Sequence, residues 1–519
     1  CASMLKKLLF FSLAGLSVVV APAHGIIRLP SVFSDNMVLQ EGAPVNVWGW
    51  ASPGEKVKIE LAGQVAELRP DNDGRWKATL GPVASSKPLR MVITGHNRIS
   101  LRNILVGEVW LCSGQSNMEW SLARSAHAAK AIAGADHPAI RLFNVNRNAI
   151  GKPQDNCQGK WSLCTPQTAK GFSAVAYHFG AAIHKATGKP VGLIQSTWGG
   201  TPVEGWTSRE ALAKVKVAKA MLERWDAQSE SYAKTRSTYA LKLNVWEAAR
   251  QKAQKEGRPA PRKPRAPLDP SSRPNNPGSL FNGMIHPLIL FSIRGATWYQ
   301  GESNVSRAYQ YRSLFPALIA DWRARWGLGE FPFLFVQIAP YRYGRNAPEM
   351  GAELREAQLM TLRGVRNTGM AVTLDIGNPR DIHPRNKQEV GRRLARWALR
   401  DTYGKADVEP SGPIYKSHLV EDGAVVLEFD HVGGGLVSLD GQPLSHFAVA
   451  GEDRVFHPVD RADIVDGRAV RLVIRRVKTP VAVRFGWSDA AVPNLGNQAG
   501  LPASSFRTDS WPGKTHHNR

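Results

Sequence analysis

The sequence is poor in cysteine and in acidic residues. It has four cysteines among 519 residues, and it shows no CxxC pair or cysteine–histidine cluster that would suggest a zinc site. Asp and Glu number 43 against 67 Lys and Arg, so the formal net charge is +24. This excess favours nucleic acid, an anionic surface or an acidic ligand, without choosing among them. No internal repeat is visible.

Long hydrophobic runs are also lacking, with one exception near the N-terminus. Two lysines precede the apolar run 8–21, and Ala21 and Ala23 then supply a small-residue cleavage signal. Residues 4–23 are therefore expected to be a secretory signal peptide, since the run is too short to span a bilayer comfortably. We expect an exported protein, periplasmic or secreted, with no integral membrane segment after cleavage.

Export would permit a disulfide. Cys157 and Cys164 flank a short polar loop and could pair in an oxidising compartment. Cys112 lies in an apolar run and is expected to be a buried thiol. Both states of the Cys157–Cys164 pair, bonded and free, agree with the sequence.

The chain divides into three regions by its apolar pattern. Residues 25–104 alternate apolar and polar positions between turn signals, which predicts a β-rich domain. Residues 105–405 carry short apolar runs that lead into helical sequence, which predicts an α/β core with a parallel sheet covered on both faces. Residues 406–519 return to a β-rich pattern. The expected core strands are 109–111, 191–194, 293–299, 333–336 and 370–374, and the expected helices include 174–186 and 389–399.

A basic insertion at 208–278 interrupts the core. Residues 209–256 predict one or two helices, and the seven prolines of 257–277 predict an extended connector. Between Arg209 and Arg265 there are 15 basic and six acidic residues. A solvated helical face is the simplest interpretation, and a docking surface for an acidic partner or glycan is the alternative. We find no nucleic-acid motif here.

The strongest candidate for chemistry is the segment 108–119. An apolar strand runs into Gly114-Gln115-Ser116 and then into a predicted helix. Ser116 would lie at the junction, where its hydroxyl is exposed and its N–H can donate to an oxyanion. The simpler interpretation is a serine that caps the helix. The segment is not a Gly-x-Ser-x-Gly elbow, because position 118 is Met.

A second candidate is the pair Asp381 and His383. A serine nucleophile needs a base, and the base needs an acceptor on its other ring nitrogen. An aspartate two residues from a histidine on a loop can reach its Nδ1. On its own this pair is a weak signal, because most loop histidines are not catalytic.

Two more segments follow predicted strands. Gly199 and Gly200 let backbone N–H groups approach a ligand closely, and Asn304 can offer a side-chain N–H to an oxyanion. Gln300 and Glu302 lie at the same edge, and their polar groups are suited to bracing the site or to holding a substrate hydroxyl. Ligand sites of open α/β sheets lie at the carboxyl edge of the strands, so these groups are expected to meet Ser116 and His383.

Taken together, the motifs resemble the sialate O-acetylesterase family of SGNH-type carbohydrate esterases. The resemblance runs through 112–120, 198–206, 281–285, 298–304, 381–391 and 497–503. It implies a flavodoxin-like SGNH hydrolase core with β-rich accessory parts. It also implies an enzyme that removes acetyl groups from sugars and needs no cofactor or metal.

The resemblance carries over residue by residue. It implies that Ser116 is the nucleophile, His383 the base and Asp381 the residue that orients it. Asn304 and the pair Gly199 and Gly200 match oxyanion positions, with either glycine as donor. Gln115, Gln300 and Glu302 complete the candidate oxyanion and substrate residues.

Several alternatives remain open. Acetylated sialic acid is the substrate we expect, and acetylated xylan or xyloglucan is the alternative, because esterases acting on plant hemicelluloses carry similar insertions. A non-catalytic glycan-binding protein would fit the two β-rich regions and the 16 Trp. A third hypothesis is a cationic protein that binds nucleic acid or envelope polymers. Four coordinated motifs favour the serine esterase, with an acetylated sugar and no nucleic acid as partner.

Overall fold

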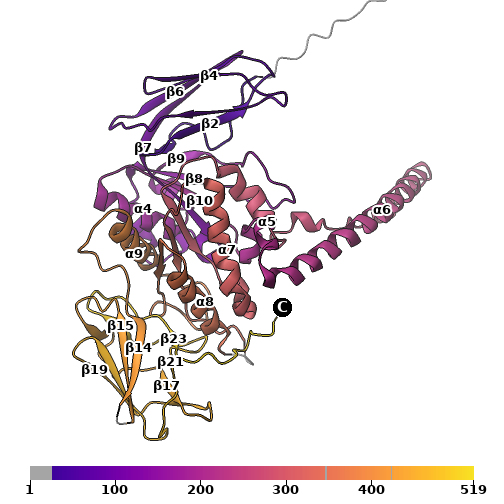
Figure 1. Ribbon diagram of the computed structural model, residues 1–519. Coiled ribbons are helices and arrows are strands. Elements are labelled where there is room, and N and C mark those ends of the chain that lie inside the picture. Colours follow the sequence, from indigo (N-terminus) through magenta and orange to yellow (C-terminus); the bar gives the residue numbers. More distant parts are fainter. Residues whose placement is uncertain (1–25, 345–347, 422, 519) are drawn as a thin grey trace, which may run out of the picture.

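The computed structural model describes residues 26–344, 348–421 and 423–518 (Figure 1). The predicted signal peptide, residues 4–23, lies outside these residues. A central sheet with helices on both faces forms the middle of the molecule, and antiparallel strands lie above and below it. Within the described residues, no helix combines the length and apolar character needed to cross a membrane.

The central sheet contains every core strand that the sequence predicts. Its order is β13-β12-β11-β7-β10-β8-β9, and all neighbours are parallel except the edge pair β8 and β9. Its inner strands are buried along their whole length, which is why they read as continuous apolar runs. The strands are β7 (Arg98–Gly114), β8 (His137–Asn144), β9 (Trp161–Cys164), β10 (Val191–Thr197), β11 (Gly295–Tyr299), β12 (Phe333–Val336) and β13 (Thr368–Ala371).

Without the edge pair, the five remaining strands follow the spatial order 2-1-3-4-5 in chain order. β7 therefore has β10 on one side and β11 on the other. A sheet with this order has its topological switch point at the first strand, and a crevice opens there at the carboxyl ends. The residues that follow β7, β10 and β11 meet at that crevice.

Helices cover both faces of the sheet (Figure 1). The helices α4 (Ala174–Thr187) and α9 (Lys387–Trp397) pack in one core, and α7 (Ala308–Trp326) and α8 (Met350–Gly364) pack in the other. The predicted apolar face of α9 is buried, and Gly391 lets it approach α4 closely, since a Cβ there would lie 2.8 Å from the Phe179 backbone nitrogen. The short helices are α1 (Ser116–Glu119), α2 (Ala128–Ala133), α3 (Pro166–Ala169) and α5 (Arg209–Ala213).

β7 joins the core to the N-terminal strands. Its first half pairs antiparallel with β6 (Leu89–Thr94), and its second half pairs parallel with β10 and β11. The strand is unbroken across residues 104 and 105, although the sequence pattern changes there. The pattern changes because one face of β7 is solvated in its first half and both faces are buried in its second half. The other strands of this part are β1 (Val38–Gln40), β2 (Val45–Trp50), β3 (Val57–Leu61), β4 (Gln64–Leu68) and β5 (Arg75–Leu80).

The C-terminal part is built from antiparallel strands. Two four-stranded sheets follow the orders β14-β15-β20-β19 and β18-β17-β21-β23, and β16 pairs with β22. The strands are β14 (Ile414–Glu421), β15 (Ala424–Asp430), β16 (Leu436–Ser438), β17 (Phe447–Ala450), β18 (Phe456–Pro458), β19 (Arg461–Val465), β20 (Ala469–Val473), β21 (Ala482–Phe485), β22 (Leu495–Asn497) and β23 (Phe506–Arg507).

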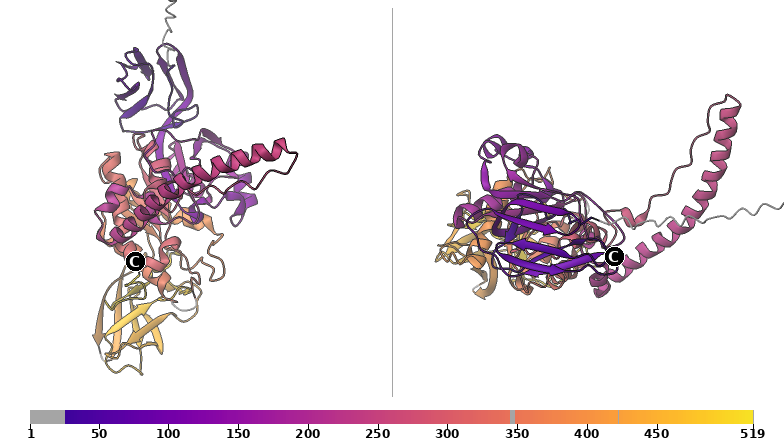
Figure 2. Two further views of the ribbon diagram at one scale, coloured as in Figure 1. Left: turned by 90° about the vertical axis from the view of Figure 1, so that its right-hand side faces the viewer. Right: turned by 90° about the horizontal axis from the view of Figure 1, so that it is seen from above.

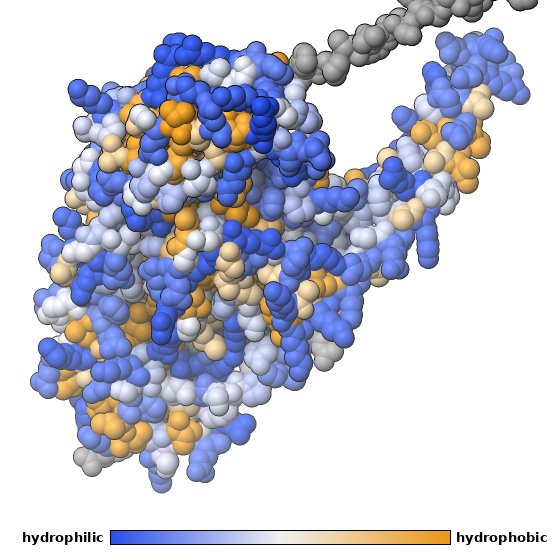
Figure 3. Space-filling view, turned by 45° about the horizontal axis from the view of Figure 1, so that its top comes forward, coloured by the Kyte–Doolittle hydropathy of each residue, from blue (hydrophilic) through white to orange (hydrophobic). Residues whose placement is uncertain are grey.

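The basic insertion contains one long helix. α6 (Lys219–Lys255) leaves the body of the molecule and points into solvent, and the proline-rich segment runs back along it (Figure 2). The Trp246 Nε1–H donates to the Pro261 carbonyl, 2.8 Å away, and ties the two together. Only Met221 and Leu222 of α6 are buried, and its far end is largely hydrophilic (Figure 3). The helix is therefore mostly a solvated arm.

The described cysteines show which of the two states left open by the sequence the structure adopts. Cys112, Cys157 and Cys164 are all buried and free, so the Cys157–Cys164 disulfide does not form in the described structure. Cys157 packs in the core that holds α7 and α8, whereas Cys164 packs in the core that holds α4 and α9. The two thiols lie in different cores, so their short sequence separation does not bring them together.

Candidate active site

Ser116 lies directly after the carboxyl end of β7. Gly114 ends the strand with φ +140°, and a Cβ there would lie 2.2 Å from the Tyr299 carbonyl oxygen. The next residue, Gln115, donates its N–H to the same carbonyl at 3.0 Å. Only glycine permits this close approach of β7 to β11, and it places Ser116 at the switch point of the sheet.

His383 meets Ser116 there. Its Nε2 lies 2.9 Å from the Ser116 Oγ, a hydrogen-bond distance. The Asp381 Oδ1 lies 3.7 Å from Nδ1 of the same ring, and it accepts the His383 backbone N–H at 2.9 Å. The structure thus brings the three predicted residues together, with the serine–histidine contact tighter than the histidine–aspartate contact.

The surroundings of His383 favour its neutral form. Burial lowers its pKa, the charge of Lys387 lowers it further, and Asp381 opposes both. The Trp120 indole stacks on the ring at 4.9 Å between centroids, and the Arg124 guanidinium covers the indole at 3.7 Å. A neutral imidazole held in this way can accept the proton of a serine hydroxyl.

Gly199 and Gly200 follow β10, as predicted. A Cβ on Gly199 would lie 3.2 Å from the Ser116 Cβ, so this backbone lies against the serine. The Gly199 N–H is occupied, because it donates to the Glu119 Oε2 at 2.9 Å. Gly200 has φ +74° and faces open space, and its N–H has no protein partner among the described residues.

Asn304 is fully buried and firmly held. Its Oδ1 accepts the Val203 N–H at 2.9 Å and a Gln300 Nε2–H at 2.7 Å, which fixes the direction of its amide nitrogen. One N–H of that nitrogen donates to the Glu204 Oε2 at 2.9 Å. The second N–H remains as a donor. Gln300 is itself fully buried, so it braces Asn304.

Gln115 and Glu302 are also largely buried. The Gln115 Oε1 accepts the Ser303 N–H at 3.2 Å, and the Glu302 Oε1 accepts from Asn117 at 2.5 Å. Both side chains link segments of the site to one another. Burial raises the pKa of the Glu302 carboxyl, and the hydrogen bond from Asn117 opposes this shift.

Other residues at the site were not singled out from the sequence. Glu119 pairs with Arg147, whose guanidinium lies 5.4 Å above the Trp198 ring. Lys387 is fully buried and donates to the Asn117 Oδ1. Glu119 and Lys387 both lie inside the quoted motifs, but no periodic pattern indicates that a charged side chain turns inward.

No group of three or more His, Cys, Asp or Glu side chains in the described part of the chain could hold a metal ion. The chemistry that the described side chains can perform is proton transfer between a serine and a histidine, beside backbone and amide N–H donors. Such a set suits acyl transfer from an ester.

Comparisons with known proteins agree with this chemistry. Residues 106–240 and 275–400 match the family model for carbohydrate esterases described as sialic acid-specific acetylesterases. The chain is 31% identical to the sialate O-acetylesterase of Rattus norvegicus over 75% of this chain and 76% of that one. It is 28% identical to the sialate O-acetylesterase of Homo sapiens over 94% of each.

A solved structure is similar over nearly the whole molecule. The crystal structure of a carbohydrate acetylesterase from Xanthomonas citri superposes with a TM-score of 0.79 and 35% sequence identity. The match covers 94% of this chain and 100% of that one. The chain therefore belongs to the carbohydrate esterase family of sialic acid-specific acetylesterases and is a carboxylic ester hydrolase that acts on O-acetylated sugars.

Proposed function

We propose that the enzyme is a serine acetylesterase with Ser116 as nucleophile and His383 as general base. The single observation that supports this most is the 2.9 Å contact between His383 Nε2 and Ser116 Oγ. His383 takes the hydroxyl proton as Oγ attacks the acetyl carbonyl, and it returns the proton to the departing sugar oxygen. Water, activated by the same imidazole, then releases acetate and frees the serine.

The oxyanion of the tetrahedral intermediate needs N–H donors. We assign this role to the Ser116 N–H, the Gly200 N–H and the second N–H of the Asn304 amide. Gly200 is preferred over Gly199 because the Gly199 N–H already donates to Glu119. Asp381 orients His383 through the backbone contact and the longer contact to Nδ1.

For the substrate we propose O-acetylated sialic acid. The Arg124 guanidinium stacks on Trp120 beside His383 and has no ion pair within the described residues. Sialic acid carries a carboxylate, and an unpaired guanidinium near the reacting ester can bind one in a bidentate manner.

A neutral acetylated hemicellulose is the second candidate. The other arginine near the site, Arg147, is already neutralised by Glu119, and it covers Trp198. A carboxylate gains less from a guanidinium that is already paired.

Acetate release separates these two substrates. Residues 24–519 would be assayed on O-acetylated sialoglycan, acetylated xylan and acetylated xyloglucan, with Ser116→Ala as the blank. Arg124→Gln should raise KM for the sialoglycan at least five-fold and leave KM for xylan unchanged. Equal effects of Arg124→Gln on both substrates would refute the role of Arg124, and release from hemicellulose alone would refute the sialate proposal. Activity in Ser116→Ala equal to that of the unaltered enzyme would refute the nucleophile itself.

We further propose a flavodoxin-like SGNH core over residues 105–405, flanked by β-rich domains at 25–104 and 406–519. The strand order 2-1-3-4-5 around β7 supports this assignment. The signal peptide 4–23 would direct export to the periplasm or the medium. N-terminal sequencing of the secreted protein should then give a start near His24, and an uncleaved N-terminus would contradict export.

A further inference from the structure

A buried polar cluster adjoins the Ser116–His383 contact, and its centre is Asn117. The Asn117 Nδ2 donates to the Glu302 Oε1 at 2.5 Å and to the Ile382 carbonyl at 3.0 Å. Its Oδ1 accepts from the Lys387 Nζ. One amide, next to the serine in sequence, therefore connects α1, the segment after β11 and the segment that carries Asp381 and His383.

Burial of the Lys387 side chain at this position is energetically unfavourable. The side chain is fully buried, with its Nζ 5.1 Å from the centroid of the Tyr299 ring and 5.9 Å from that of Trp120. Burial lowers its pKa to about 7, although Glu302 and Asp381 oppose this shift. Replacing a buried ionic pair with apolar side chains of similar volume is often neutral or stabilising. Packing alone therefore does not account for a lysine here.

We propose that Lys387 is a positioning residue which, through Asn117, holds the Asp381–His383 segment against Ser116 and supplies positive charge that keeps His383 neutral. The mechanical part rests on the Ile382 carbonyl, which lies between the two site residues in sequence and is held by Asn117. The electrostatic part rests on the place of Lys387, whose Nζ lies 5.9 Å from the centroid of the Trp120 ring that stacks on His383. From there the lysine charge lowers the pKa of His383, after burial, which is the largest cause.

The charge of Lys387 opposes that of Asp381 at the His383 ring. The charged groups that face His383 are Lys387, Asp381 and Arg124, and those that face Lys387 are Glu302 and Asp381. Removing the Lys387 charge leaves Asp381 less opposed, so the pKa of His383 rises. On acidification, kcat/KM of an enzyme without this charge should therefore begin to fall at a higher pH than kcat/KM of the unaltered enzyme.

The test is the pH profile of kcat/KM for a small acetyl ester, measured on Lys387→Met in the full chain. The acid limb should move to higher pH, and the plateau should fall at least ten-fold. Lys387→Arg keeps the charge and should keep the limb near its original position. Val390→Ala, on the same buried face of α9 but apolar, should lower Tm and leave the limb unchanged.

An unmoved limb in folded Lys387→Met would overturn the electrostatic part. If Lys387→Met does not fold, Asn117→Leu provides the second test, because it cuts the link to Ile382 and leaves the lysine in place. It should lower kcat more than it changes KM, and an unchanged kcat would overturn the positioning role. This inference depends on the proposed nucleophile, whose own failure would appear separately as full activity in Ser116→Ala.

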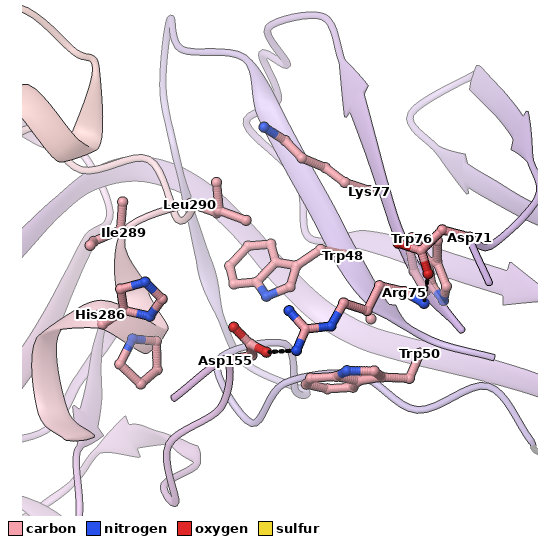
Figure 4. Close-up of a pocket in the computed structure, with 12 residues that line it drawn as sticks. Trp48, Trp50, Asp71, Arg75, Trp76, Lys77, Asp155, His286, Ile289 and Leu290 are labelled. Atoms are coloured by element: carbon pink, nitrogen blue, oxygen red, sulfur yellow. Dashed lines mark hydrogen bonds and ion pairs between the residues drawn. The ribbon is translucent and has the colours of Figure 1, made fainter. Parts of the chain in front are cut away.

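An independent observation concerns a hollow between the N-terminal strands and the core. It has a volume of about 390 Å³ and is lined by Trp48, Trp50, Arg75, Asp155, His286 and Leu290, among others (Figure 4). None of the residues of the Ser116 site lines it. Its size falls in the range of small-ligand sites.

The lining combines apolar and paired polar groups. The Arg75 guanidinium points toward Asp155 and pairs with it at 2.8 Å, and the indoles of Trp48 and Trp50 line the same hollow (Figure 4). This ion pair is open to solvent, with 59% of the Arg75 side chain and 36% of the Asp155 side chain exposed. A neighbouring donor and acceptor with no net charge suit the hydroxyls of a neutral sugar, and an indole suits its C–H face.

We infer that this hollow binds a neutral sugar residue of a polysaccharide, away from Ser116. The test is affinity gel electrophoresis of the full chain with deacetylated xyloglucan, deacetylated xylan and polysialic acid. One of the neutral polymers should retard the protein, and Trp50→Ala and Arg75→Ala should weaken that retardation at least five-fold. Trp246→Ala, on the solvated arm, should bind as the unaltered protein does.

Hydrolysis of a small acetyl ester should be the same in all four proteins. Retardation that survives both Trp50→Ala and Arg75→Ala would overturn the inference, as would the absence of retardation by either neutral polymer. Retardation by polysialic acid alone would also contradict it. None of these results affects the Ser116 assignment, whose readout is acetate release.

Discussion

The long contact between Asp381 and His383 has a measurable consequence. At 3.7 Å, a carboxylate and an imidazolium attract each other by about 1 kcal/mol in bulk water and about 4.5 kcal/mol at an effective dielectric constant of 20. The Asp381 side chain is 40% exposed, so solvent screening places the interaction near the lower value. Asp381→Asn should therefore lose about 1–2 kcal/mol of transition-state stabilisation.

That loss corresponds to about a 5- to 30-fold decrease in kcat/KM. An asparagine Oδ1 can still accept the His383 backbone N–H, so the segment keeps its conformation. Loss of a buried triad aspartate costs about 10⁴-fold, which is far more. His383→Ala removes the base itself and should cost at least about 10³-fold.

The assay is steady-state hydrolysis of a small acetyl ester by Asp381→Asn, His383→Ala and the unaltered enzyme, with Tm measured for each. A decrease beyond about 10³-fold in folded Asp381→Asn would refute the screening argument. A loss equal to or larger than that of His383→Ala would refute the assignment of Asp381 as an orienting residue.

Burial and Lys387 lower the pKa of His383, so kcat/KM should fall with acidification only below about pH 6.5, and a midpoint above pH 7 would contradict this. Gly114→Ala places a Cβ 2.2 Å from the Tyr299 carbonyl, so it should lower the free energy of unfolding by more than about 2 kcal/mol in urea titration, and an unchanged midpoint would refute the close approach. Replacing 228–264 with a short glycine–serine linker removes only solvated parts of the arm, so Tm and hydrolysis of a small ester should stay the same, and a large loss of either would show that the arm supports the core.

Much of the core could be predicted from the sequence because its strands are buried on both faces. Continuous apolar runs marked β10 and β12 to within a few residues, and the polar residues after each strand marked the crevice. The three residues Ser116, Asp381 and His383 meet as expected because the carboxyl ends of parallel strands share one edge.

The remaining features depend on tertiary packing. The apolar periodicity of the sequence does not reveal that β7 is one unbroken strand, because the strand is buried on one face in its first half and on both faces in its second half. The sequence left the Cys157–Cys164 pairing open, because the short separation of the two residues along the chain does not show that their thiols pack in different cores. Lys387 follows a motif histidine by four residues, and nothing local indicates that its charge is buried.

Activation of Ser116 by His383 can be tested without a natural substrate. The most direct measurement is labelling of residues 24–519 with a fluorophosphonate, followed by peptide mapping by mass spectrometry. One adduct is expected, on Ser116, and it should form at least 100-fold more slowly in His383→Ala. An adduct on another residue, or labelling of Ser116 at an unchanged rate in His383→Ala, would contradict this expectation.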